Sequence, residues 1–260
     1  MNIAASPAAA RSAELSLENS TGFARARIGL MIPSSNRLSE PQFRHFLPRD
    51  VGLHVTRLQM TGKHSKPLAP LLEDVERAAN ALGDAKCDVI VFHCTANSME
   101  HGPEGEQRIL DAVRRGSGAQ AMSTAQAVVE AFRASGMTKI VLVSPYVQSH
   151  NDHEIAYLLE QGFETLHDVA LNASPSDGYL AIPPSRWCDV VRANMRDDAD
   201  GYFLSCTNTT QIDTIATLEL EMQKPVINSN QATIWAGLKR IAGKLGGMPQ
   251  IPALGALMKL

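Results

Sequence analysis

The segment Asp88–Asn97 reads DVIVFHCTAN, and a second segment, Asp200–Thr209, reads DGYFLSCTNT. Each begins with Asp, continues with largely apolar residues and closes on a Cys-Thr pair, and the two cysteines lie 112 residues apart. The same offset relates Arg27–Asn36 (RIGLMIPSSN) to Lys139–Gln148 (KIVLVSPYVQ), in which a basic residue and an apolar run precede a Pro at the seventh position. One offset that joins two separate pairs of segments predicts two similar lobes, each with one thiol at the end of a strand.

Apolar, β-branched runs alternate along the chain with longer segments of helical periodicity. Several runs, such as IVLVS, are apolar on both faces, which is typical of central strands in a parallel sheet. This alternation predicts an α/β fold with two lobes of four parallel strands, flanked by helices. The expected strands are Ile28–Ile32, Leu53–Leu58, Val89–His93, Ala119–Met122, Ile140–Ser144, Thr165–Leu171, Tyr202–Ser205 and Val226–Asn228. The expected helices are Leu71–Leu82, Glu106–Arg115, Ala125–Ser135, Asp152–Gln161, Arg186–Asn194, Gln211–Met222 and Ala232–Ala242.

The pattern divides the chain into four parts. Residues 1–26 are expected to be a mobile N-terminal extension, residues 27–122 lobe one and residues 123–228 lobe two. Residues 229–260 are expected to form a C-terminal helix that crosses back to lobe one. Glycines stand where helix C-caps are expected, at Gly83, Gly136, Gly162 and Gly243.

The composition excludes several classes of function. The chain has 260 residues and a formal net charge of −3, so it has no basic field for nucleic acid. No apolar run approaches the roughly 20 residues that span a bilayer, which argues against a membrane protein. Four cysteines without a secretory signal predict reduced thiols and a cytoplasmic location.

Cys94 and Cys206 are the strongest catalytic candidates. Each is expected at the carboxyl end of a strand, where ligands of open α/β sheets bind, and next to backbone N–H groups that lower a thiol pKa. Two thiols that face each other across a cleft are able to remove a proton from one face of a carbon and return it to the other. A cysteine is also a common core residue, but the duplicated context favours function. Cys87 and Cys188 have no matched partner at the offset.

Polar residues that follow the strands are the candidates for binding a small carboxylate. Their hydroxyl, amide and backbone N–H groups suit an anion, although helix N-capping is an alternative role. Tyr146 is expected to donate to a carboxylate or enolate-like oxygen, and Asp177 lies in a polar loop that reads SPSDGY. The predicted binding residues are Ser34, Asn36, Thr95, Ala96, Ser123, Thr124, Tyr146, Asp177, Thr207 and Asn208.

The sequence offers little support for a metal or a cofactor. His93 and Cys94 are adjacent and point to opposite sides of a strand, and there is no CxxC or HxxxH pattern. GxGxxG, P-loop and GxSxG motifs are also absent from the sequence. We therefore predict no metal and no cofactor.

Several of these motifs together resemble those of a known family. PSSN at Pro33–Asn36, Cys94, SPY at Ser144–Tyr146 and the block SCTNTTQIDTIATLELEMQKPVINSNQA around Cys206 resemble the aspartate/glutamate racemase superfamily. The resemblance covers nearly all of Arg27–Gly243, and it is closest to the maleate isomerase and arylmalonate decarboxylase branch. The chain is also similar to racemase-like proteins of ectoine utilisation. The resemblance implies two Rossmann-like lobes related by a pseudo-twofold axis, a cofactor-independent active site between them, and a homodimer or higher homo-oligomer.

The resemblance leaves four functions open. The first is a racemase or epimerase of a small amino or dicarboxylic acid, with the two cysteines as acid and base. The second is a maleate cis–trans isomerase in which Cys94 is the covalent nucleophile and Cys206 the acid/base. The third is an arylmalonate-type decarboxylase, although those enzymes have Gly at the position of Cys94. The fourth is a non-catalytic protein that binds a small carboxylate.

Two departures from the maleate isomerases bear on this choice. Those enzymes have apolar residues after each cysteine, whereas this chain has Cys-Thr twice. They also have Asn near the position of Asp177, and a carboxylate that faces a dianionic substrate is costly unless a cation pairs with it. Both departures favour the racemase slightly.

Overall fold

The computed structural model describes residues 24–60 and 66–260 and contains two four-stranded parallel sheets. The first has the order β2-β1-β3-β4 and the second the order β6-β5-β7-β8, so the two sheets repeat one topology. The α/β fold with two similar sheets is therefore confirmed. The strands of the first sheet are β1 (Ala26–Pro33), β2 (Val51–Leu58), β3 (Val89–Phe92) and β4 (Gln120–Ser123). Those of the second are β5 (Lys139–Ser144), β6 (Glu164–Ala170), β7 (Gly201–Leu204) and β8 (Val226–Asn228).

Ten α-helices in the described part of the chain cover these sheets. The longer helices are α3 (Leu68–Asp84), α5 (Gly102–Ser117), α6 (Thr124–Ala134), α7 (Gln148–Glu160), α9 (Pro184–Ala193) and α11 (Ser229–Leu245). The shorter ones are α2 (Ser39–Phe46), α4 (Thr95–Met99), α8 (Asp177–Ala181) and α10 (Ile215–Met222). Short 3₁₀ helices cover Gln211–Thr214, Pro252–Leu254 and Ala256–Lys259. The predicted helix Gln211–Met222 is thus a 3₁₀ turn followed by α10. Helices α2, α4 and α8 were not predicted, because segments of eight residues or fewer carry little periodicity.

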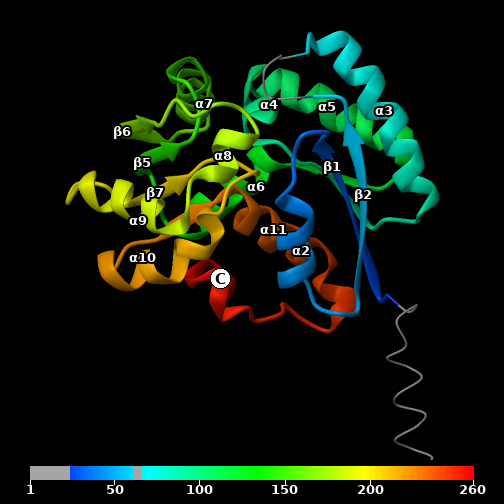
Figure 1. Ribbon diagram of the computed structural model, residues 1–260. Helices are drawn as coiled ribbons and strands as arrows, with labels where there is room; N and C mark the ends of the chain where they lie inside the picture. Colours follow the sequence, from blue (N-terminus) through cyan, green and yellow to red (C-terminus); the bar gives the residue numbers. More distant parts are fainter. Residues whose placement is uncertain (1–23, 61–65) are drawn as a thin grey trace, which may run out of the picture.

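The alternation of side chains in the first sheet assigns its two faces to different helices. Met31, Ile90 and Phe92 pack into a cluster with residues of α3 and α5. Their neighbours Leu30 and Val91 point the other way, into a cluster that also holds residues of α6, α11 and the second sheet. Figure 1 shows α6 and α11 between the two sheets. One continuous apolar core therefore joins the sheets and fixes the cleft between their strand ends.

The predicted division of the chain into an extension, two lobes and a C-terminal helix stays a prediction. Most of the expected extension over residues 1–26 lies outside the described residues. None of the helices in the described ranges is long and apolar enough to cross a membrane.

Two of the four predicted glycine caps are confirmed. Gly136 and Gly162 follow α6 and α7 with φ of 68° and 89°, a backbone conformation that favours glycine. Gly83 and Gly243 were predicted wrongly, because they lie inside α3 and α11. Helix α11 continues to a left-handed cap at Gly246.

Two glycines within helices differ in whether the structure has room for a Cβ atom. A Cβ at Gly116 would lie 2.4 Å from the Glu76 carbonyl oxygen, where α5 crosses α3, whereas a Cβ at Gly243 would meet nothing within 4 Å. We expect Gly116→Ala to lower the free energy of unfolding by about 1–3 kcal/mol through overpacking. Gly243→Ala is the matched control and should raise it by about 0.5–1 kcal/mol through helix propensity. Urea unfolding measures both, and equal shifts of the same sign would contradict the close crossing.

Candidate active site

A cavity of about 450 Å³ lies at the carboxyl ends of the central strands of both sheets. Cys94 follows β3 of the first sheet and Cys206 follows β7 of the second, and both line this one cavity. As predicted, one cysteine from each sheet lines the same cavity. The other predicted binding residues that line it are Asn36, Ala96, Tyr146, Thr207 and Asn208.

Cys94 is the residue immediately before α4, and 9% of the residue is exposed. Its Sγ donates to Asn97 Oδ1 at 3.0 Å, and Asn97 Nδ2 donates in turn to Glu100 Oε2 at 3.0 Å. Burial raises the pKa of the Cys94 thiol to about 12, the Asn97 backbone N–H lowers it, and the charge of Cys206 raises it further. A negative charge on one thiol thus disfavours a charge on the other.

Cys206 has an unusual backbone, with φ of 134°. This conformation is costly for a residue with a side chain and is most often found at functional sites. The Asn208 backbone N–H donates to Cys206 Sγ at 3.3 Å, and the Cys206 N–H donates to Ser229 Oγ at 3.1 Å. Burial raises the pKa of the Cys206 thiol to about 12, against hydrogen bonds from the Tyr146 side chain and the Asn208 N–H that lower it. The prediction of N–H donors at the thiols is confirmed, but burial outweighs them.

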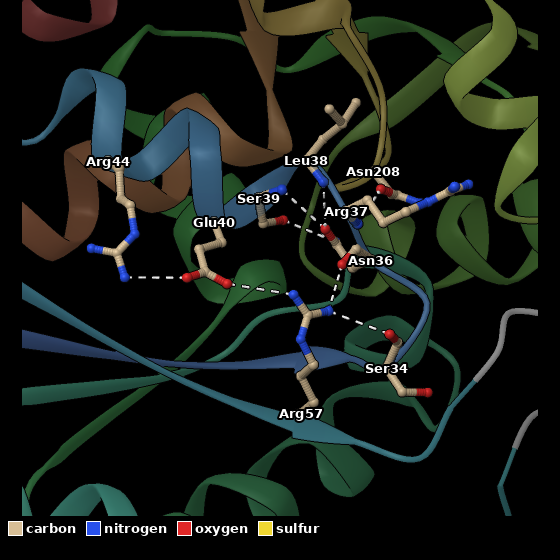
Figure 2. A network of polar contacts seen from close by, with 9 residues as sticks. All are labelled: Ser34, Asn36, Arg37, Leu38, Ser39, Glu40, Arg44, Arg57 and Asn208. Carbon is tan, nitrogen blue, oxygen red and sulfur yellow. Dashed lines mark hydrogen bonds and ion pairs between the residues drawn. The ribbon is translucent and has the colours of Figure 1, made fainter.

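Hydrogen bonds between the loop after β1 and the loop after β7 join the two halves of the molecule, each built on one sheet, at the cavity. Figure 2 shows the part of this network around Asn36, with Asn208 beside Arg37. Asn36 Nδ2 donates to the Thr207 carbonyl and to Thr207 Oγ1, both at 3.2 Å, and the Arg37 N–H donates to Asn208 Oδ1 at 2.9 Å. Asn36 Oδ1 accepts from the backbone N–H groups of Leu38 and Ser39 at the start of α2. The loop after β1 is therefore tied directly to the residues that follow Cys206.

A second link between the halves runs closer to the thiols. The hydroxyl groups of Thr95 and Ser229 are hydrogen-bonded at 2.8 Å, and Ser229 Oγ also accepts the N–H of Cys206. Thr95 is completely buried and does not line the cavity. The Thr95 side chain therefore links the start of α4 to the backbone of Cys206 through Ser229, and it does not face a ligand.

Four other predicted binding residues also lie away from the cavity lining. Ser123 caps α6 by accepting from the Gln126 N–H and donates to Glu106. Thr124 Oγ1 is hydrogen-bonded to His93 Nδ1, and both residues are fully buried. Ser34 Oγ donates to the Met60 carbonyl at 3.0 Å. These three residues lie at strand ends as predicted, but their hydroxyl groups are hydrogen-bonded to neighbouring protein groups. The fourth residue that lies away from the cavity is Asp177.

Asp177 begins α8 and forms an ion pair with Arg37, with 88% of its side chain exposed. It was predicted in a loop that faces the substrate, whereas it stands outside the lining of the cavity. Its carboxylate has the cation that the sequence argument required. The residue therefore no longer counts against a dianionic substrate.

The residues that line the cavity without having been predicted include an acidic residue and two histidines. Glu100 ends the short α4, and His150 and His153 lie one turn apart on α7. The i, i+3 spacing of the two histidines just after Tyr146 was the available signal. Burial lowers the pKa of His150, while the nearby charge of Glu100 raises it.

The described residues contain no cluster of three His, Cys, Asp or Glu side chains that suits a metal ion. His93 Nε2 is hydrogen-bonded to Asn230 Oδ1 at 2.8 Å. Burial lowers the pKa of His93 to about 4, so the ring is neutral and structural.

Comparison with known proteins identifies the family. The arylmalonate decarboxylase family model matches residues 28–250. The chain belongs to this family. A maleate isomerase of Nocardia farcinica (strain IFM 10152) is 30% identical over 90% of this chain and 95% of that protein. A maleate isomerase of Geobacillus stearothermophilus is 26% identical over 89% of this chain and 96% of that protein.

A solved structure points in the same direction. A cysteine-to-serine mutant of the Nocardia farcinica maleate cis–trans isomerase, with a covalently bound succinylcysteine intermediate, has a TM-score of 0.80 to this chain. It is 27% identical, and the match covers 90% of this chain and 98% of that one. With these relatives, the chain is an enzyme of the isomerase class whose chemistry is cysteine-based.

Proposed function

We propose that the protein interconverts the cis and trans isomers of a small unsaturated dicarboxylate of the maleate type. The observation that carries the proposal is a single cavity lined by two buried cysteines, one from each sheet. Support comes from maleate isomerase relatives that match along about nine-tenths of the chain. The succinylcysteine described for the Nocardia enzyme supports addition of a thiol to the double bond.

In the proposed reaction one sulfur is the nucleophile and the other transfers the proton. The Cys94 thiolate forms a bond to one olefinic carbon, and the electron pair of the double bond takes the Cys206 proton at the other carbon. The resulting succinyl thioether has a single bond at the centre, about which it rotates. The Cys206 thiolate then removes one proton from the carbon that was protonated, the double bond re-forms, and the Cys94 thiolate leaves. No atom or electron is gained or lost in the cycle.

The electrostatics of the cavity disfavour two thiolates at the same time. Burial raises the pKa of both thiols, and each charge opposes the other, so double ionisation is disfavoured. At neutral pH both sulfurs are therefore protonated, and the scheme requires that Cys94 alone lose its proton before it adds to the double bond.

The two carboxylates of the substrate need hydrogen-bond donors in the cavity. Asn36, Thr207 and Asn208 line the cavity together with Cys206, and Tyr146 lies near both sulfurs. We assign the hydrogen bonds to the substrate carboxylates to these side chains and to the backbone N–H groups after each cysteine, including that of Ala96.

Racemisation of a small amino or dicarboxylic acid is the second candidate. The repeated Cys-Thr pair at equivalent strand ends favours it, because a symmetric pair suits proton exchange on two faces of one carbon. Decarboxylation has less support, since Cys94 stands where those enzymes have glycine.

Proton NMR in deuterated water separates the candidates. We expect maleate to give fumarate, with deuterium entering only at the olefinic carbons. Exchange of α-protons in amino acids without any maleate turnover would replace the proposal by the racemase. Loss of carbon dioxide from substituted malonates would replace it by the decarboxylase.

A further inference from the structure

Glu154 is a buried carboxyl group that the proposed reaction does not use. It lies on α7, its relative exposure is 0%, and its Oε1 accepts from Ser205 Oγ at 2.9 Å. Its Oε2 is buried and has no hydrogen-bond partner among the described residues. A buried carboxylate with a free oxygen is costly, so the group requires an explanation.

The contact of Glu154 leads directly to a catalytic cysteine. Ser205 is the residue before Cys206, whose φ of 134° is unfavourable for a side chain. The Ser205 side chain is held by Glu154, and the Cys206 N–H is held by Ser229. These two hydrogen bonds fix the strained turn from both sides.

The charge of Glu154 also reaches the thiols. Burial is the largest cause that raises the pKa of Cys206 and of Cys94, and an ionised Glu154 raises both further. Burial likewise raises the pKa of Glu154 to about 8, so the carboxyl group keeps its proton at neutral pH. An ionised Glu154 also raises the pKa of Tyr146 and Tyr179. Other titratable groups on or next to the elements packed against α7 include Glu100, Glu106, His167 and Asp168.

We propose that Glu154 is a positioning residue that holds the Ser205–Cys206 turn and works in its protonated form. In this form it anchors the turn without placing a negative charge beside the two sulfurs. Ionisation keeps the anchor but opposes formation of a thiolate. The inference rests on the proposed use of both thiols, but its test needs no substrate.

The test measures alkylation of Cys206 by iodoacetamide, read by peptide mass spectrometry on either side of about pH 8. Glu154→Gln keeps the shape and the acceptor for Ser205 but stays neutral. Below about pH 8 the variant and the wild type should react at equal rates. Above it the variant should react roughly two- to tenfold faster, since one pKa unit is about a tenfold change in thiolate. Glu160→Gln, which changes an exposed carboxylate on the same helix, should follow the wild type.

Equal rates for wild type and Glu154→Gln at both pH values would overturn the proposal. So would a constant ratio between them, which would mean that Glu154 is ionised throughout. If circular dichroism shows that Glu154→Gln does not fold, the wild type decides alone: the rise of its alkylation rate with pH should flatten near pH 8. A straight rise would contradict the proposal. Absence of maleate turnover would sink the proposed function while leaving this result standing.

Discussion

Cys94→Ser and Cys206→Ser should each lower kcat/KM for maleate by about a thousandfold or more. Serine is not ionised at the pH at which a thiol reacts, so Cys94→Ser removes the nucleophile. Cys206→Ser removes the proton donor, and general acid–base catalysis contributes roughly 10²- to 10⁴-fold. The measurement is the initial rate of fumarate formation, with the fold checked by circular dichroism.

The other two cysteines are the matched controls. Cys87 and Cys188 are buried and free, as Cys94 and Cys206 are, but neither lines the cavity. Cys87→Ser and Cys188→Ser should therefore leave kcat/KM within about threefold of the wild type, with only a stability cost of about 1 kcal/mol. Retained activity in Cys94→Ser or Cys206→Ser would contradict the two-thiol scheme.

Asn36→Ala should have the largest effect on stability among the residues of the cavity. The Asn36 amide is 1% exposed and makes hydrogen bonds to Leu38, Ser39 and Thr207. Its removal leaves buried N–H and C=O groups without partners, at about 1–3 kcal/mol for each unsatisfied group. We expect a loss of about 2–4 kcal/mol in the free energy of unfolding, together with a raised KM.

Asn80→Ala is the control for this prediction. Asn80 is exposed on α3 and donates only to the Glu76 carbonyl within its own helix. Its replacement should change the free energy of unfolding by less than about 0.5 kcal/mol. Equal urea midpoints for the two variants would show that the Asn36 hydrogen bonds do not hold the halves together.

The repeat in the sequence predicted the sheets and the two cysteines because both depend on local pattern. Apolar runs fix the strands, and the carboxyl ends of parallel strands gather at one edge. The sequence did not predict the roles of Ser123 and Thr124, because a hydroxyl at a strand end suits a cap as well as a ligand. Only the packed structure distinguishes these uses.

Other features of the site depend on contacts that no local pattern encodes. The pairing of Asp177 with Arg37 joins residues 140 positions apart. The positive φ of Cys206 occurs at a residue that is not glycine, so the sequence gives no sign of it. Glu154 looks like a surface residue of α7 in the sequence, yet it is buried beside Ser205.

Intact-protein and peptide mass spectrometry of Cys206→Ser incubated with maleate tests the central claim most directly. In this variant solvent water supplies the proton that completes the thioether on Cys94, and because no Cys206 thiolate removes a proton again, the thioether should break down slowly and accumulate. We predict an adduct with the mass of one maleic acid, located on Cys94, that is absent from the Cys94→Ser variant. An adduct on Cys87 or Cys188 instead, or no adduct while fumarate is still produced, would contradict the account.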